Sequence, residues 1–95
     1  MQIVIKRRAD RNIKKLALYI ADKGYPETAE NYVNRLYDFL FSLGNHPNAY
    51  ALCKNKKWAA RNFHCAVFER TYVVPFKIMA NPVYVMNIIH GARLK

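Results

Sequence analysis

Tyr72-Val73-Val74-Pro75-Phe76-Lys77-Ile78 is followed by the turn Met79-Ala80-Asn81-Pro82 and then by Val83-Tyr84-Val85-Met86-Asn87-Ile88-Ile89. β-Branched and aromatic residues on both sides of an Asn-Pro turn predict a β-hairpin. The second run ends in His90-Gly91-Ala92-Arg93, which places an imidazole and a guanidinium at a rigid strand end suited to binding or chemistry. Pro75 lacks the N–H that a central strand donates, so the strand either bulges there or turns that nitrogen to an unpaired side.

The segments before this hairpin predict two further strands and a loop. Ile3–Ile5 is a short apolar run, and residues 60–69 alternate as a half-buried strand does. Glu69-Arg70-Thr71 then turns the chain into the hairpin. Residues 44–59 contain Pro47, several Asn and the lysines 54, 56 and 57, and we assign them to a loop.

Two helices are predicted between the first strand and this loop, because apolar residues recur there every three to four positions. Asp10 is suited to the start of the first helix and Gly24 to its end. Pro26 is acceptable in the first turn of the second helix, which Gly44 ends. The short link between them predicts an antiparallel αα-hairpin, in which Tyr19, Tyr32 and Tyr37 are expected to pack. The apolar positions are Ile13, Leu16, Ala17 and Ile20 in the first helix and Ala29, Tyr32, Val33, Leu36, Phe39, Leu40 and Leu43 in the second.

The order β-α-α-β-β-β predicts an α+β fold, in which an N-terminal αα-hairpin packs on one face of an antiparallel sheet. A chain of 95 residues is expected to form one domain, residues 1–95. No apolar run approaches the ~20 residues that span a bilayer, and no signal peptide is recognisable, so we expect a cytoplasmic protein without a membrane partner.

The net charge and the cysteine content limit the kinds of partner, metal and cofactor that the chain is expected to bind. Sixteen Lys and Arg against six Asp and Glu give a net charge of +10, which favours a polyanionic or acidic partner. Cys53 and Cys65 with His64 do not complete a zinc ligand set, so we predict no metal and no cofactor. A single disulfide is one alternative for the cysteines, but reduced thiols are expected in a cytoplasmic protein.

These parts together resemble the RelE/ParE superfamily of type II toxin–antitoxin toxins, over nearly the whole chain. Ala29, Leu43 and Pro47 follow the family's "A…L…P" pattern, and Arg61-Asn62-Phe63 is similar to its "R-x-F" motif. Tyr72–Ile78 resembles the family's third strand, and His90-Gly91-Ala92-Arg93 resembles the ParE-like ending. The resemblance implies a growth-arresting toxin of a plasmid stabilisation system, held inactive by a cognate acidic antitoxin.

The resemblance leaves three possible functions: two activities known in the family, and an inactive toxin. RelE-like members cut mRNA on the ribosome without a metal, and ParE-like members inhibit DNA gyrase. In RelE-like nucleases an arginine follows the Tyr of the third strand, where this chain has Val73, and a C-terminal tyrosine contributes, where this chain has none after Arg93. We therefore favour a non-enzymatic ParE-like toxin. The alternatives are a RelE-like endoribonuclease and a degenerate toxin that retains only antitoxin binding.

The candidate site residues follow from these alternatives. For a nuclease, His90 or His64 would serve as acid or base, and Arg61 and Arg93 would bind phosphate. For a binding protein, Arg61, Arg70, Lys77 and Arg93 would contact the partner or nucleic acid. Structural roles are the competing interpretation: His64 on the open sheet face, His90 in a backbone hydrogen bond, and Arg61 paired with Glu69.

Overall fold

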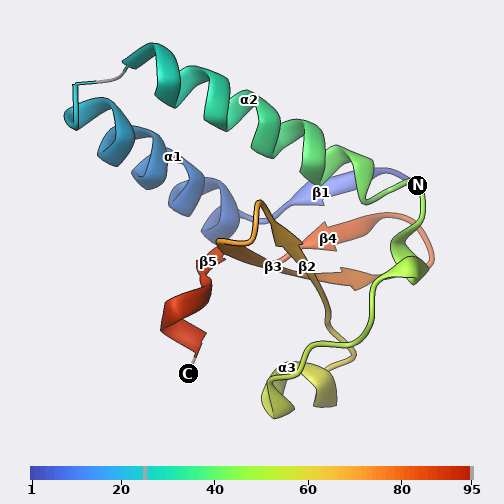
Figure 1. The fold of residues 1–95 in the computed structure, drawn as a ribbon. Helices are drawn as coiled ribbons and strands as arrows, with labels where there is room; N and C mark the ends of the chain where they lie inside the picture. Colours follow the sequence, from blue (N-terminus) through green and yellow to red (C-terminus); the bar gives the residue numbers. More distant parts are fainter. Residues whose placement is uncertain (25, 95) are drawn as a thin grey trace.

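Two long helices lie side by side over one face of a sheet in the computed structural model of the chain (Figure 1). The structure describes the backbone of residues 1–24 and 26–94 and the side chains of residues 1–24 and 26–92. The predicted α+β fold is confirmed. The elements are β1 (Ile3–Ile5), α1 (Arg7–Asp22), α2 (Pro26–Ser42), the 3-10 turn η1 (Pro47–Ala49), α3 (Lys56–Ala60), β2 (His64–Phe68), β3 (Tyr72–Ile78), β4 (Val83–Val85), β5 (Ile89–His90) and the 3-10 turn η2 (Gly91–Leu94).

The sheet is mixed, whereas the sequence predicted an antiparallel one. Its strand order is β1-β4-β3-β2, with β5 also paired to β3. β1 runs parallel to β4, with Ile3 opposite Val83, and the Lys6 N–H donates to the Val85 carbonyl at 2.9 Å. The prediction was wrong here because β1 reaches the sheet from the far end of the sequence, and local patterns give no direction for such a pair.

Pro75 lies within β3, opposite a break between the strands β4 and β5. The run 83–89 was predicted as one strand, but it divides into β4 and β5 around Met86–Ile88. The Pro75 carbonyl accepts from the Met86 N–H at 2.9 Å, and a strand residue points its nitrogen and its carbonyl to the same side. The nitrogen of Pro75 therefore faces the break, where a ladder donor is not required. Of the two alternatives, the structure adopts the second for the nitrogen, which faces the gap between β4 and β5, whereas the Pro75 carbonyl on that side is bonded to Met86.

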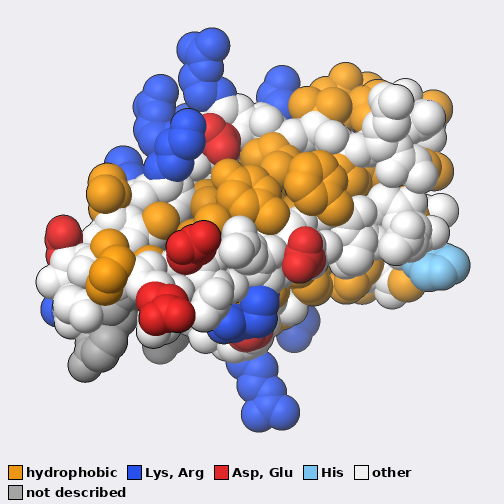
Figure 2. Space-filling model, turned by 90° about the horizontal axis from the view of Figure 1, so that it is seen from above, with side chains coloured by type: hydrophobic (Ala, Val, Ile, Leu, Met, Phe, Trp, Pro, Cys, Tyr) orange, Lys and Arg blue, Asp and Glu red, His pale blue; other side chains and the backbone are white. Residues whose placement is uncertain are grey.

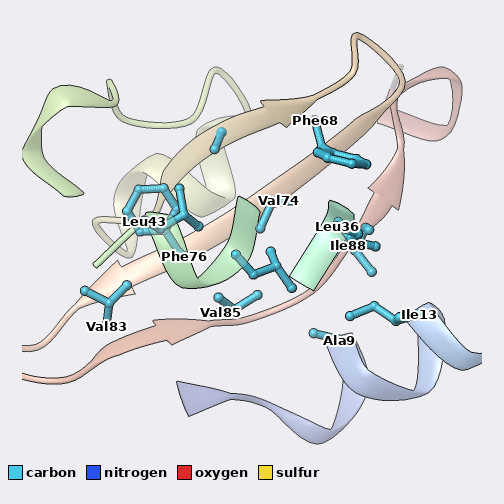
Figure 3. Close-up of a cluster of buried hydrophobic side chains, with 12 residues drawn as sticks. Ala9, Ile13, Leu36, Leu43, Phe68, Val74, Phe76, Val83, Val85 and Ile88 are labelled. Carbon is cyan, nitrogen blue, oxygen red and sulfur yellow. The ribbon is translucent and has the colours of Figure 1, made fainter. Parts of the chain in front are cut away.

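The helical hairpin follows the predicted period. Gly24 takes a left-handed conformation with φ of 87° and ends α1, and Pro26 begins α2. The helices turn their apolar faces toward β3 and β4, and the core lies between the two layers (Figure 3). Of the three tyrosines expected to pack there, Tyr32 and Tyr37 border the core, but Tyr19 is 62% exposed. The buried core residues include Ala9, Ile13, Leu36, Leu40, Leu43, Phe68, Val74, Phe76, Val83 and Val85.

The predicted loop 44–59 contains a helix that the sequence analysis missed. α3 has five residues, and the Asn55 side chain caps it by accepting from the N–H groups of Lys57 and Trp58. The predicted strand 60–69 consequently starts later, at His64. Figure 1 shows α3 projecting at the end of the molecule opposite α2.

Cys53 and Cys65 form a disulfide, which corrects the expectation of reduced thiols. The bond joins the segment before α3 to β2, and the two segments are also paired through the backbone. The Cys53 N–H donates to the Phe63 carbonyl at 2.9 Å, and the Cys65 N–H donates to the Ala51 carbonyl at 3.2 Å. The two ends of the segment that carries α3 are therefore held together, by the disulfide and by these backbone hydrogen bonds.

The turn between β2 and β3 is tied to the helices. Glu69 and Arg70 have positive φ values of 47° and 61°, which is the conformation of a tight hairpin turn. The Glu69 carboxylate pairs with Arg35 of α2 at 3.0 Å. The ion-pair partner of Glu69 is therefore Arg35, and not Arg61 as one interpretation of the sequence had it. Within the described part of the chain, no helix is long and apolar enough to cross a membrane.

Candidate functional site

The predicted site residues lie at two ends of β3. His64 pairs with Phe76 near the end of that strand, and His90 pairs with Tyr72 at its start. The two histidines are therefore separated by roughly 13 Å along the strand at the usual rise per residue. A general acid and a general base must both reach the reacting group, so these imidazoles do not form one catalytic pair in this structure.

His90 holds the chain at the start of η2. Its Nδ1 accepts a hydrogen bond from the Ala92 N–H at 3.1 Å, and its ring meets the Tyr72 ring edge-on at 5.4 Å between centroids. Because the Nδ1 lone pair is occupied, neutral His90 carries its proton on Nε2. The exposed imidazole can therefore donate a hydrogen bond to a partner, but it has no free lone pair to act as a base.

His64 has the opposite tautomer and a more enclosed position. Its Nδ1 lies 2.7 Å from the Tyr50 carbonyl, which can only accept, so Nδ1 carries the proton. Its ring stacks on Phe76 at 5.6 Å between centroids. These contacts connect the loop after α2 to the sheet, and they give His64 a packing role on the helix side of the sheet.

The predicted Lys and Arg residues, like the two histidines, are distributed between the two ends of β3. Arg61 follows α3, and the Lys77 ammonium lies 5.9 Å from the centre of the Phe63 ring, so both are at the end of β3 nearer α3. Arg70 is exposed in the β2–β3 turn at the other end. The side chain of Arg93 lies outside the described residues.

A groove of about 580 Å³ lies between α1 and the strands β3 and β5. His90 lies at this groove, and so does Lys15, which brings an ammonium to the same side as the imidazole. The chain of α1 contributes Asn12, Lys15, Leu16 and Tyr19, and the strand side contributes Thr71, Tyr72, Ile88, Ile89 and His90. A groove lined by apolar side chains together with a few polar ones is typical of a binding site.

Sequence reasoning did not include the α1 residues of this groove. Asn12, Lys15, Leu16 and Tyr19 recur at helical spacing, which places them on one face of α1. That signal was available, but the sequence does not show that this face meets β5. The Asn12 side chain joins α1 to the segment before β5, since its amide donates to Asn87 Oδ1 at 2.7 Å.

Among the described residues, no group of three or more His, Cys, Asp or Glu side chains is placed to hold a metal ion.

Comparison with known proteins identifies the family. Residues 3–95 match the family model for the ParE toxin of the type II toxin–antitoxin system parDE. The chain belongs to the ParE toxin family. A toxin of this family implies an antitoxin partner, and the resemblance inferred from the sequence is confirmed.

A solved structure of a ParDE system shares the fold. The chain is similar to the structure described as "Chromosomal ParDE TA system from P. aeruginosa", with a TM-score of 0.80 and 16% sequence identity over 95% of each chain. This likeness supports the two-layer arrangement of the helical hairpin and the sheet. No curated protein matches the chain in sequence.

Proposed function

We propose that this ParE-family chain arrests growth by inhibiting DNA gyrase through binding rather than catalysis, and that an acidic antitoxin neutralises it. The observation that supports binding is the separation of His64 from His90 along β3, together with the use of each Nδ1 in a backbone hydrogen bond. A nuclease that used both histidines would need them to converge on one phosphate.

Val73 strengthens this proposal. It occupies the position at which RelE-like nucleases carry an arginine, and it pairs with Val67 and Ile89 between two strands. An aliphatic side chain cannot stabilise the negative charge that develops on a cleaved phosphate. Among the other predicted cations, Arg61 and Lys77 lie at the end of β3 away from His90, and Arg70 lies in the turn at the His90 end.

The distribution of charge supports an acidic antitoxin. Residues 43–95 contain eight Lys and Arg but a single acidic residue, Glu69, and that carboxylate is paired with Arg35. Opposite charge accelerates encounter and disfavours partners of the wrong sign. Residues 43–95, the sheet half of the molecule, therefore carry a positive electrostatic potential that would attract an acidic chain.

The groove beside His90 is the contact surface that we propose for the target, and one substitution tests it. His90→Ala should lower the potency of gyrase inhibition about ten-fold in a DNA supercoiling assay, equivalent to about 1.4 kcal/mol of binding. His46→Ala is the matched control, because His46 is also exposed but lies in the loop after α2. Equal loss in both variants, or a loss that follows the melting temperature, would contradict this role for His90.

Expression without an antitoxin separates the three activities. We expect growth arrest with accumulation of gyrase-linked DNA breaks, and primer extension should show no new 5′ ends within codons. Discrete cleavage inside codons would instead establish the RelE-like nuclease. Normal growth with soluble protein that still binds its antitoxin would identify a degenerate toxin.

A further inference from the structure

The N-terminal half of α1 presents an unbroken cationic surface. Between Arg7 and Lys15 every exposed side chain is Lys or Arg, namely Arg7, Arg8, Arg11, Lys14 and Lys15. At 3.6 residues per turn these five positions fall within about 120° of the helix circumference. Figure 2 shows Lys and Arg side chains gathered along one edge of the helical layer and projecting into solvent. We call this surface, formed by the five residues, the α1 basic arc.

This arrangement of cations does not stabilise helix α1. A helix carries partial positive charge at its N-terminus, which disfavours cations there. Arg7 and Arg11, and Arg11 and Lys15, are like charges four positions apart, and such pairs repel. Lys14 pairs with Asp10 at 2.9 Å, but no described residue forms an ion pair with Arg7, Arg8 or Arg11. These three guanidiniums are therefore available to an external anion.

The surroundings of the arc indicate which anion it fits. A protein partner is usually anchored by apolar or aromatic side chains, and single-stranded nucleic acid by aromatic rings that stack on its bases. The guanidiniums of the arc have neither on α1, since its exposed apolar residues, Leu18 and Tyr19, lie beyond Lys15, the one member of the arc that borders Tyr19. A dense row of guanidiniums instead matches the phosphates of a double helix, which Arg binds in bidentate fashion.

We infer that the α1 basic arc binds the phosphate backbone of double-stranded DNA without sequence preference. The major groove of B-DNA admits an α-helix, whereas that of an RNA duplex is too narrow. The arc exposes no Asn, Gln, Ser or Thr beside its cations, so backbone contacts provide the affinity. Lys15 also borders the groove proposed for gyrase, so the binding is tested on Arg7, Arg8 and Arg11 and is measured without gyrase.

Fluorescence anisotropy with a labelled 20-base-pair duplex of random sequence tests the inference over a series of NaCl concentrations. The triple variant Arg7→Gln, Arg8→Gln, Arg11→Gln should bind at least ten-fold more weakly at 100 mM salt. The slope of log K against log salt should fall by about 2.7, because each phosphate contact contributes about 0.9. Circular dichroism should show an unchanged fold, since all three side chains are exposed.

The matched control removes the same charge elsewhere. Lys54→Gln, Lys56→Gln, Lys57→Gln deletes three exposed cations around α3, and it should change the affinity less than three-fold. Equal weakening of both variants would overturn the inference, because net charge alone would then explain binding. It would also be overturned if single-stranded DNA, an RNA duplex or poly-glutamate competed as well as the DNA duplex.

Discussion

The carboxylate of Asp10 accepts two hydrogen bonds inside the helical hairpin. We expected Asp10 to begin the first helix, but α1 starts at Arg7, and Asp10 instead contacts Lys14 at 2.9 Å and the Tyr37 hydroxyl of α2 at 3.0 Å. The hydrogen bond from Lys14, followed by that from Tyr37, lowers the pKa of Asp10 below its usual value of 3.8. Burial, followed by the bond to Asp10, raises the pKa of Tyr37.

This lowered pKa predicts an acid-sensitive contribution to stability. Because the pKa of Asp10 is lower in the folded chain, its contribution is complete above about pH 3.8 and is lost as the pH falls through the folded value. The melting temperature of the wild type should therefore drop more between pH 5 and pH 2.5 than that of Asp10→Asn. Asp22→Asn, at the exposed end of the same helix, is the control and should follow the wild type. Parallel curves for all three proteins would contradict the assignment.

Among the elements, α3 depends on its flanking contacts. A helix of five residues is too short to be stable alone, so the Asn55 cap and the closure of its base by Cys53–Cys65 hold it in place. The disulfide encloses a segment with a sequence separation of 12 residues, and closing such a loop restricts the unfolded chain.

Replacing Cys53 and Cys65 by Ala should lower the free energy of unfolding by about 2–3 kcal/mol, as expected from loop closure. Urea denaturation measures this loss, and amide exchange should increase in α3 more than in β3. A reductant should produce a similar loss in the wild type and none in the double variant. If the reductant destabilises both proteins equally, the disulfide is not the cause.

Elements with a regular period could be predicted from the sequence, and those fixed by distant contacts could not. The apolar stripes of α1 and α2 and the glycine at position 24 specified the hairpin locally. α3 is shorter than two helical turns, so no period could reveal it. The parallel pairing of β1 with β4 and the placement of Lys15 and His90 at one groove involve distant segments, and no local pattern encodes them.

The molecule as a whole divides its charge unevenly. The α1 basic arc and the sheet half are cationic, whereas α2 carries Glu27, Glu30 and Asp38 with Arg35 as its only base. A net charge of +10 on 95 residues repels itself and opposes the compact state.

Salt should therefore stabilise the folded chain. Raising NaCl from 20 to 300 mM screens the repulsion and should raise the melting temperature by roughly 2–6 °C, as measured by calorimetry. The triple Gln variant of the α1 basic arc should begin at a higher melting temperature and gain less. A melting temperature that falls with salt would show that ion pairs such as Arg35–Glu69 outweigh the repulsion.

The pairing of Ile3 with Val83 has a consequence for synthesis on the ribosome. β1 and the helical hairpin are translated before β4, the strand that joins β1 to β3. Until then the apolar faces around Ile13 and Leu36 have no completed sheet to cover them. The sheet therefore cannot form strand by strand in the order of synthesis, and its centre closes only when the C-terminal part of the chain has been made.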